Sequence, residues 1–267
     1  MPRFAAGLEY DGRAYSGWQF QTGLNTLQDV VQRALSRVAD APVDCVCAGR
    51  TDAGVHAQGQ VIHFDSDAVR SERGWRLGAN TYLPPEVSVA WLREVPGQFH
   101  ARFSATARSY RYFIFNRDSR SGLAVGRATW ERRPLDAARM HAVAQALVGE
   151  HDFSAFRAAE CQSRSPVRRV ECIEVTRSAE WVTIAITANA FLHHMVRNVA
   201  GLLMSVGHAE SPPERVAAVL AARDRKLSAA TAPPDGLYLA AVRYPAEFGL
   251  PCGGNLPQSA IIGRSFE

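Results

Sequence analysis

Apolar residues in the first hundred positions follow first the period of a strand and then the period of a helix. Residues 3–10 are typical of a strand, and residues 27–38 repeat apolar side chains at helical spacing directly after Thr26, a residue that favours a helix start. Three further strands are expected at residues 43–48, 59–64 and 87–95, and one further helix at residues 69–82. The order strand, helix, strand, strand, helix, strand is typical of a ferredoxin-like α+β unit.

The same kinds of pattern restart after residue 105. Strands are expected at residues 110–115, 167–176, 181–188 and 236–244, and helices at 135–148, 191–206 and 212–222. We therefore predict an α+β fold of two ferredoxin-like α/β halves with mixed or antiparallel sheets. These halves span residues 1–105 and 106–245, and a loose tail follows at residues 246–267.

The composition is that of an ordinary globular protein and excludes several other classes. The apolar fraction is 47% and the charged fraction 21%, and no run of about 18 apolar residues predicts a membrane span. The N-terminal residues lack the apolar stretch of a signal peptide, so we expect a soluble, cytoplasmic protein without a membrane partner. Five cysteines without a C-x-x-C pair favour buried thiols over disulfides or a zinc site.

The charged residues permit a nucleic-acid partner without requiring one. The formal net charge is +4, and Lys226 is the only lysine, so that arginine supplies almost all of the positive charge. Arginine binds phosphate through a planar fork and stacks on bases, which lysine does poorly. Candidate phosphate contacts are Arg102, Arg108 and Arg111 near residue 105, and Arg164, Arg168 and Arg169 in a later loop. Each group is equally compatible with a solvated surface.

One glycine-bounded segment, residues 49–54, carries a candidate catalytic group. Gly49 and Gly54 allow a tight backbone turn, and Asp52 lies between them with Arg50 two residues before it. A carboxylate presented in this way can act as a nucleophile, a base or a metal ligand. The residues alone favour a simpler interpretation, in which Asp52 hydrogen-bonds its own turn.

Five segments resemble, in family order, the motifs of the TruA family of tRNA pseudouridine synthases. The Asp52 segment, residues 48–57, resembles the family's signature. The others are Tyr10-Asp11-Gly12 with Gly17-Trp18-Gln19, then Ser109-Tyr110-Arg111-Tyr112, then residues 191–198, and finally residues 232–239. One such string would be weak evidence, but five in order, from about residue 8 to 244, identify the chain as a member of this family.

The resemblance implies an activity, a fold and roles for four residues. The family's catalytic aspartate corresponds to Asp52, which would attack the target uridine at the uracil ring or the ribose. Tyr110 would stack on the uracil, Arg197 would pair with Asp52, and Arg50 would hold the target nucleotide out of the stem. The fold implied is the pseudouridine synthase fold, with a central catalytic cleft between the two halves, in a homodimer. The substrate implied is the anticodon stem-loop of tRNA at positions 38 to 40, and no cofactor or metal is implied.

Residue chemistry alone leaves alternatives open for these positions. Tyr110 alternates with Tyr112 on its strand and could fill a core. Arg197 lies on an apolar helix, where a guanidinium either reaches solvent or needs a buried anionic partner, for which Asp52 is the candidate. His193 and His194 are expected on the same helix about 100° apart, so we expect no shared metal ion.

Three functions remain in competition at this stage. The leading one is isomerisation of uridine by Asp52, an activity that needs no redox cofactor, and the chain lacks the G-x-G-x-x-G and P-loop motifs. The alternative is a non-catalytic tRNA-binding or folding module, in which the Asp52 turn is only structural. A hydrolase acting on a small molecule is a third, although no second carboxylate is evident at the motif.

Overall fold

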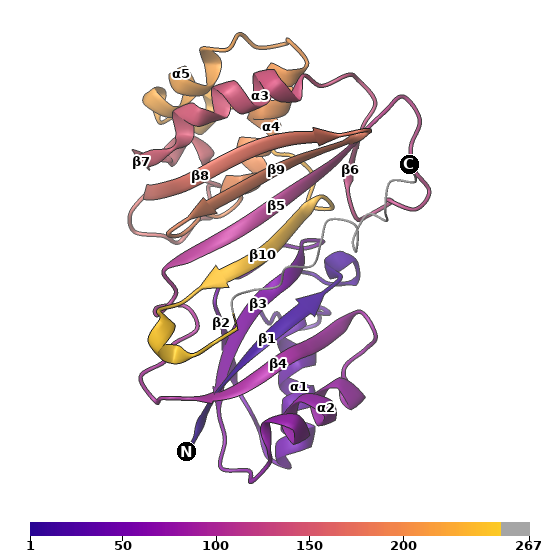
Figure 1. The fold of residues 1–267 in the computed structure, drawn as a ribbon, viewed down its shortest axis with the longest axis vertical. Coiled ribbons are helices and arrows are strands. Elements are labelled where there is room, and N and C mark those ends of the chain that lie inside the picture. Colours follow the sequence, from indigo (N-terminus) through magenta and orange to yellow (C-terminus); the bar gives the residue numbers. More distant parts are fainter. Residues whose placement is uncertain (252–267) are drawn as a thin grey trace. The chain divides into compact units, whose positions relative to one another are not determined.

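The computed structural model describes residues 1–251 of the chain, and it has an α+β architecture (Figure 1). The longer strands are β1 (Arg3–Tyr10), β3 (His56–Asp65), β4 (Val87–Val95), β5 (Ala107–Asn116), β8 (Val167–Ser178), β9 (Trp181–Ala188) and β10 (Leu237–Arg243). The short strands are β2 (Cys45–Cys47), β6 (Thr129–Glu131) and β7 (Gly149–Asp152). The α-helices are α1 (Leu27–Ala39), α2 (Glu72–Tyr82), α3 (Ala137–Ala144), α4 (Met195–Gly207) and α5 (Arg215–Ala222). Within residues 1–251, none of the helices combines the length and the apolar character needed to cross a membrane.

The chain forms two compact units, and the first is made from both ends of the described chain. It contains Met1–Thr106 and the residues from Tyr238 onward. In its sheet, β1 lies between β3 and β4 and is antiparallel to both, and β2 pairs antiparallel with β3. This is the 4-1-3-2 strand order produced when two split β-α-β units interlock. The strand β10 extends the sheet by pairing parallel to β3, with Tyr238 opposite His56.

The core of the first unit lies between this sheet and the helices α1 and α2 (Figure 1). Trp75 of α2 is fully buried, with its ring against Phe4 of β1 and Phe64 of β3 at centroid distances of 5.6 and 5.1 Å. The α1 side chains Leu27, Val31 and Leu35, which are spaced by four residues, are buried as well. The helical period in the sequence therefore marks the face of α1 that covers the sheet.

The second unit comprises Ala107–Leu237 and has its own sheet in the order β5-β9-β8-β7. Neighbouring strands in this order are antiparallel, while β6 pairs parallel with β5. The helices α3, α4 and α5 pack together, and α3 contacts β8. Phe153 and Phe156 are fully buried in this unit, and Asn198 of α4 donates a hydrogen bond to the Phe156 carbonyl at 2.8 Å.

The α+β prediction is confirmed, and the element boundaries differ in instructive ways. The expected helix at 69–82 begins at Glu72, because the Ser71 hydroxyl accepts a hydrogen bond from the Gly74 N–H at 3.0 Å and caps the helix there. Thr26 does precede α1, but its side chain makes no capping hydrogen bond. The strands β6 and β7 were not expected, because each is too short to show a recognisable alternation of apolar and polar residues.

Three further differences concern the end of the chain and α4. The helix expected at 191–206 begins only at Met195, because His194 adopts a left-handed conformation with φ of 62°. The expected strand at 236–244 is β10, whose residues from Tyr238 belong to the first unit although the sequence assigned them to the second half. Of the expected tail, Ala246–Phe248 forms a short 3₁₀ helix, and residues 252–267 lie outside the described residues.

Candidate active site

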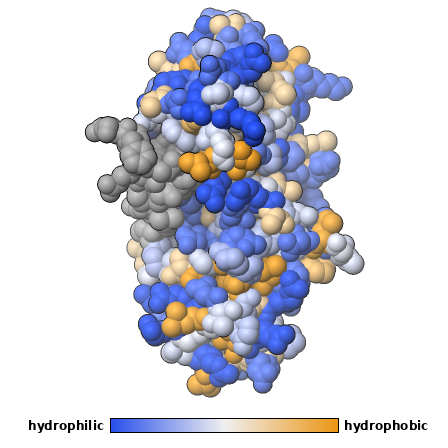
Figure 2. Space-filling view, turned by 90° about the vertical axis from the view of Figure 1, so that its right-hand side faces the viewer, coloured by the Kyte–Doolittle hydropathy of each residue, from blue (hydrophilic) through white to orange (hydrophobic). Residues whose placement is uncertain are grey.

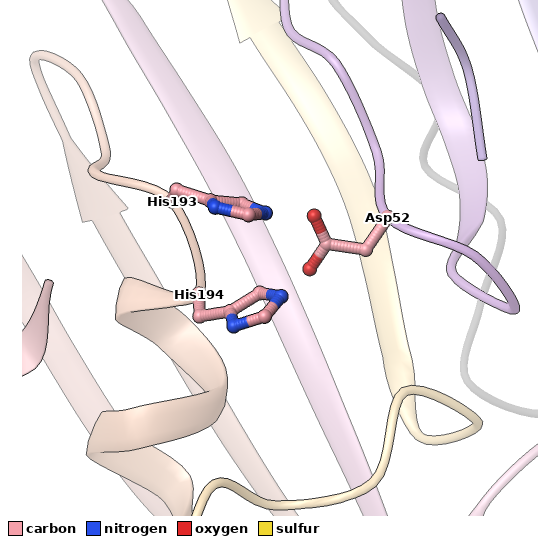
Figure 3. Close-up of side chains that lie close together, drawn as sticks. All are labelled: Asp52, His193 and His194. Atoms are coloured by element: carbon pink, nitrogen blue, oxygen red, sulfur yellow. The ribbon is translucent and has the colours of Figure 1, made fainter. Parts of the chain in front are cut away.

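Asp52 lies on the turn of residues 49–55 that joins β2 to β3, which we call the Asp52 turn. Figure 3 shows its carboxylate projecting away from the backbone of this turn. The turn is closed by a hydrogen bond from the Val55 N–H to the Asp52 carbonyl at 3.1 Å. The Thr51 carbonyl accepts from the Trp18 N–H at 2.9 Å. These hydrogen bonds of the backbone fix the shape of the turn. The half-buried side chain of Asp52 projects from the fixed turn.

The segment of residues 10–18 forms the backing of the Asp52 turn. A Cβ atom on Gly12 would lie 2.0 Å from the Val55 carbonyl oxygen, and one on Gly17 would lie 2.9 Å from the Thr51 carbonyl oxygen. Gly17 also has a positive φ of 94°. Any side chain at either position would push the turn away. The two glycines of the first sequence motif are therefore required by close backbone approach to the turn that carries Asp52.

Three buried side chains tie the Asp52 turn to the sheet. The Tyr10 hydroxyl and the Thr51 hydroxyl are hydrogen-bonded at 2.8 Å. Gln60 of β3 donates from Nε2 to the Gly49 carbonyl at 2.7 Å and to the Tyr10 hydroxyl at 3.3 Å, and its Oε1 accepts from the Gly49 N–H at 3.4 Å. Gln60 is 0% exposed, and buried polar groups of this kind rigidify a structure when they are fully satisfied. We refer to Tyr10, Thr51 and Gln60 as the turn network.

His56, which directly follows the turn, is a structural residue. It is 2% exposed, and its Nδ1 accepts a hydrogen bond from the Gly12 N–H at 3.1 Å. Its ring stacks on Tyr238 of β10 with centroids 4.5 Å apart. Burial alone would raise the pKa of the adjacent Asp11, but the hydrogen bonds from Arg13 and the proximity of His56 hold that pKa below its usual range. His56 is therefore packed between the backing segment and β10.

Arg50 lies on the Asp52 turn and is exposed to solvent. Its positive charge acts on the pKa of the Cys47 thiol at the end of β2. Burial raises the pKa of Cys47 to about 12, while the positive charges of Arg50 and Arg102 act in the opposite direction. Both guanidinium groups therefore lie within electrostatic reach of the end of β2, on the first unit.

The two other predicted site residues, Tyr110 and Arg197, belong to the second unit. Tyr110 of β5 is 9% exposed, and its ring meets the Phe191 ring edge-on at 4.9 Å. Tyr112, two residues along, is fully buried and its hydroxyl donates to the Pro233 carbonyl at 2.9 Å, so Tyr112 fills the core. Burial raises the pKa of Tyr112 far above its usual range.

Arg197 is half-buried in the first turn of α4 and is fixed to the segment before β10. Its Nε donates to the Ala232 carbonyl at 2.9 Å, and the Ala232 N–H donates to the Arg197 carbonyl at 3.1 Å. This reciprocal pair orients the guanidinium, in contrast to a side chain that merely extends to solvent. The sequence motif at 232–239 therefore includes a residue that positions Arg197, which sequence reasoning did not identify.

The angular argument against a shared metal at His193 and His194 does not hold. Both residues precede α4 rather than lying on it, and their rings lie side by side with centroids 4.0 Å apart (Figure 3). The left-handed backbone of His194 brings the two side chains together, which a helix would have kept apart. The Ala158 N–H donates to the His193 carbonyl at 3.1 Å and holds this segment in place.

Comparison with known proteins decides the family. A tRNA pseudouridine synthase family model matches residues 6–104 and 143–245. The chain belongs to the tRNA pseudouridine synthase family. The tRNA pseudouridine synthase A of Methylococcus capsulatus is 59% identical over 93% of this chain and 92% of the relative. The proteins of the same description from Nitrosococcus oceani and Legionella pneumophila are 54% and 55% identical, over 93% of this chain and 96% and 95% of the relatives.

The family assignment made from the five motifs is therefore confirmed, together with the assignment to a tRNA-modifying isomerase class. The match covers the Asp52 turn, its backing segment, and the segments of Arg197 and Ala232. Tyr110 lies between the two matched ranges. The individual roles of Asp52, Arg50, Tyr110 and Arg197 stay predictions.

Proposed function

We propose that this protein converts uridine to pseudouridine at positions 38 to 40 of the tRNA anticodon stem-loop, with Asp52 as the nucleophile. Membership of the tRNA pseudouridine synthase family supports the reaction and the tRNA substrate. The observation that carries the role of Asp52 is the Asp52 turn itself, whose backbone is fixed by the turn network while the carboxylate projects from it. A fixed nucleophile lowers the entropic cost of reaching the transition state.

The reaction moves the uracil ring on its ribose without a change in composition. The bond between N1 and C1′ breaks, a bond between C5 and C1′ forms, the proton on C5 leaves, and N1 gains a proton. Asp52 would open this sequence by attacking either the uracil ring or C1′. The target nucleotide must leave its stack, which costs a few kcal/mol. Stacking on Tyr110 would recover about 1–3 kcal/mol of this cost.

The remaining roles follow the charges of the side chains. Arg197, oriented by Ala232, would pair with the Asp52 carboxylate, and exposed Arg50 would hold the backbone of the everted nucleotide. The sequence motifs further support a homodimer, which sedimentation of the full chain would reveal as twice the monomer mass. Because tRNA is the proposed substrate, we also infer a cytoplasmic location.

The decisive experiment replaces Asp52 with asparagine, which keeps size and hydrogen bonding but removes the nucleophile. We expect Asp52→Asn to abolish tritium release from tRNA carrying 5-tritiated uridine, and to leave tRNA affinity within about threefold. Asp40→Asn is the matched control, because Asp40 is exposed and sits in a left-handed helix cap that asparagine tolerates. Retained turnover in Asp52→Asn would refute the role of Asp52.

The same assay separates isomerisation from the alternative of a non-catalytic tRNA-binding or folding module. Such a module would bind tRNA equally well with and without the Asp52 carboxylate, and the wild-type protein would release no tritium. Mapping of pseudouridine along the reacted tRNA then tests the positions. Modification outside 38 to 40 would contradict the proposed specificity while leaving the reaction intact.

A further inference from the structure

Phe103 is an aromatic side chain that the fold leaves in solvent. It is 75% exposed, whereas Phe99, four residues earlier in the same connection between β4 and β5, is 0% exposed. Residues 96–106 belong to the first unit, and we call them the Phe103 loop. Figure 2 shows hydrophobic residues in small groups among polar ones on the face that it draws, the usual state of a surface. Isolated exposure of this kind needs no explanation by itself, but the way in which the fold holds Phe103 does.

The backbone beneath Phe103 is fixed at successive residues. His100 and Ser104 exchange two hydrogen bonds, from the His100 N–H to the Ser104 hydroxyl at 3.0 Å and from the Ser104 N–H to the His100 carbonyl at 2.9 Å. The N–H groups of Arg102 and Phe103 both donate to Nδ1 of His100, at 3.1 and 3.2 Å. Phe103 is therefore presented by an ordered loop.

The base of the loop is attached to the sheet and to the end of the described chain. The Ala101 N–H donates to Nδ1 of His63 on β3 at 3.2 Å, and the Ala101 carbonyl accepts from the Tyr244 hydroxyl at 2.6 Å. Ala101 is itself fully buried. The loop thus has the rigidity of the elements beside it, which reduces the entropy lost when a ligand stacks on Phe103.

Three rings form a column that ends at Phe103. The centroids of His63 and His100 are 4.6 Å apart, and those of His100 and Phe103 are 4.4 Å apart with the planes 33° from each other. Burial lowers the pKa of His63 to about 4, and burial with the charge of Arg3 lowers the pKa of His100. This series of ring contacts ends at Phe103, the exposed ring of the three.

A positive charge lies over the exposed Phe103 ring. The guanidinium carbon of Arg102 is 5.5 Å from the centre of that ring. A flat neutral ring next to a guanidinium group matches a nucleobase with its phosphate, because bases stack on aromatic faces and arginine binds phosphate.

We propose that Phe103 is a stacking platform for an unpaired base of the tRNA substrate, and that Arg102 binds an adjacent phosphate. The ordered loop, the contacts among the three rings and the guanidinium of Arg102 together carry this assignment. It rests on the proposed function, which supplies tRNA as the partner. The platform acts in binding and takes no part in bond making, so it contributes to substrate affinity.

Substitutions at Phe103 separate stacking from general hydrophobicity. Phe103→Ala is expected to weaken binding of tRNA about 5- to 150-fold, the loss of one stacked base. Phe103→Leu, which keeps apolar bulk but no π face, should resemble Phe103→Ala, while Phe103→Trp should bind like the wild type. Leu77→Ala is the control, since Leu77 is 45% exposed on α2 of the same unit and should have no effect.

Kinetics distinguish a failure of this inference from a failure of the proposed function. With tritiated tRNA, Phe103→Ala should raise KM and leave the single-turnover rate at saturation unchanged. Arg102→Gln should weaken binding and reduce the slope of log affinity against log salt by about 1.

If the wild type modifies tRNA but Phe103→Ala and Phe103→Leu have unchanged KM and affinity, the platform is refuted and the enzyme activity stands. If the wild type neither binds nor modifies tRNA, both fail. An altered sedimentation mass with unaltered tRNA affinity would assign Phe103 to a protein interface instead.

Discussion

The Asp52 turn and the Phe103 loop lie on the same unit and are both held by hydrogen bonds from side chains, but the chemistry of their supports differs. The Asp52 turn is fixed by a phenol, a hydroxyl and an amide, groups that keep their hydrogen-bonding capacity across the physiological pH range. In the Phe103 loop, besides the hydroxyls of Ser104 and Tyr244, two imidazole nitrogens hold the backbone, and these accept hydrogen bonds only while they are unprotonated. A rigid loop can therefore be insensitive or sensitive to acid, depending on the groups that hold it.

The largest expected effect comes from pushing the backing segment off the Asp52 turn. In Gly12→Ala the new Cβ would meet the Val55 carbonyl oxygen at 2.0 Å, a backbone contact that cannot yield without moving the turn. We expect activity to fall by more than about a hundredfold, because small displacements of reacting groups are costly. Urea unfolding should show a loss above about 2 kcal/mol.

The matched control for this substitution is Gly97→Ala. A Cβ on Gly97 would have no atom within 4 Å, and Gly97 lies in the Phe103 loop of the same unit. It should keep both activity and stability. Equal effects of the two substitutions would show that the close approach of Gly12 to the turn does not matter.

A smaller effect is expected when the turn network loses one hydroxyl. Tyr10→Phe keeps the ring against Trp18 but leaves the Thr51 hydroxyl and the Gln60 amide each without one partner. The free energy of unfolding should fall by about 1–2 kcal/mol. The rate at saturating tRNA should fall about tenfold, while KM stays the same, because the network orients Asp52 and does not touch tRNA. Tyr82→Phe, an exposed tyrosine of α2, should change neither quantity. A rise in KM alone would contradict the positioning role.

The effect that is smallest near neutral pH is a loss of stability that grows in mild acid. His63 faces His100, Arg3 and Asp65. Burial, aided by the first two, lowers its pKa to about 4 against the opposing influence of Asp65. Because the unfolded chain takes up this proton near pH 6.5 and the folded protein does not until about pH 4, the free energy of unfolding decreases as pH falls between these values. The loss should reach about 1.4 kcal/mol one pH unit below 6.5.

The test is the pH dependence of urea unfolding in the wild type and in His63→Asn, whose side-chain oxygen can accept the Ala101 N–H without titrating. Between pH 6.5 and 4, the free energy of unfolding of the variant should depend less steeply on pH, by the slope that uptake of one proton causes. The tRNA affinity of the variant should also depend less on pH than that of the wild type. An unchanged slope would mean that His63 does not support the Phe103 loop in the way proposed.

The sequence predicted what depends on short-range periodicity. The strand at 87–95 and the hairpin strand at 181–188 were located to the residue, because alternating burial leaves a direct imprint on composition. The start of α4 was missed by four residues, since the left-handed backbone of His194 has no signature in a run of apolar and histidine residues. The spacing of apolar residues therefore located the helices and strands well, but it located their irregular ends poorly.

The candidate site was predicted only in part, for the same reason. The Asp52 turn could be found from its glycines and from the family motif. Its support could not be found, because Gln60 and Tyr10 are fifty positions apart in sequence and meet only in the folded sheet. The exposure of Phe103 could not be predicted, because the sequence does not distinguish a buried phenylalanine in a loop, such as Phe99, from an exposed one.

The parallel pairing of β10 with β3 also bears on the order in which the protein is made. Because synthesis proceeds from the N-terminus, β3 emerges from the ribosome long before Tyr238, and the edge that β10 will occupy waits for the whole of Ala107–Leu237 to be translated. The Tyr238 ring that stacks on His56 arrives with the same late strand. A nascent chain that ends before β10 should therefore lack the clamp on the residue that directly follows the Asp52 turn, so the support of the Asp52 turn becomes complete only after β10 has been synthesised.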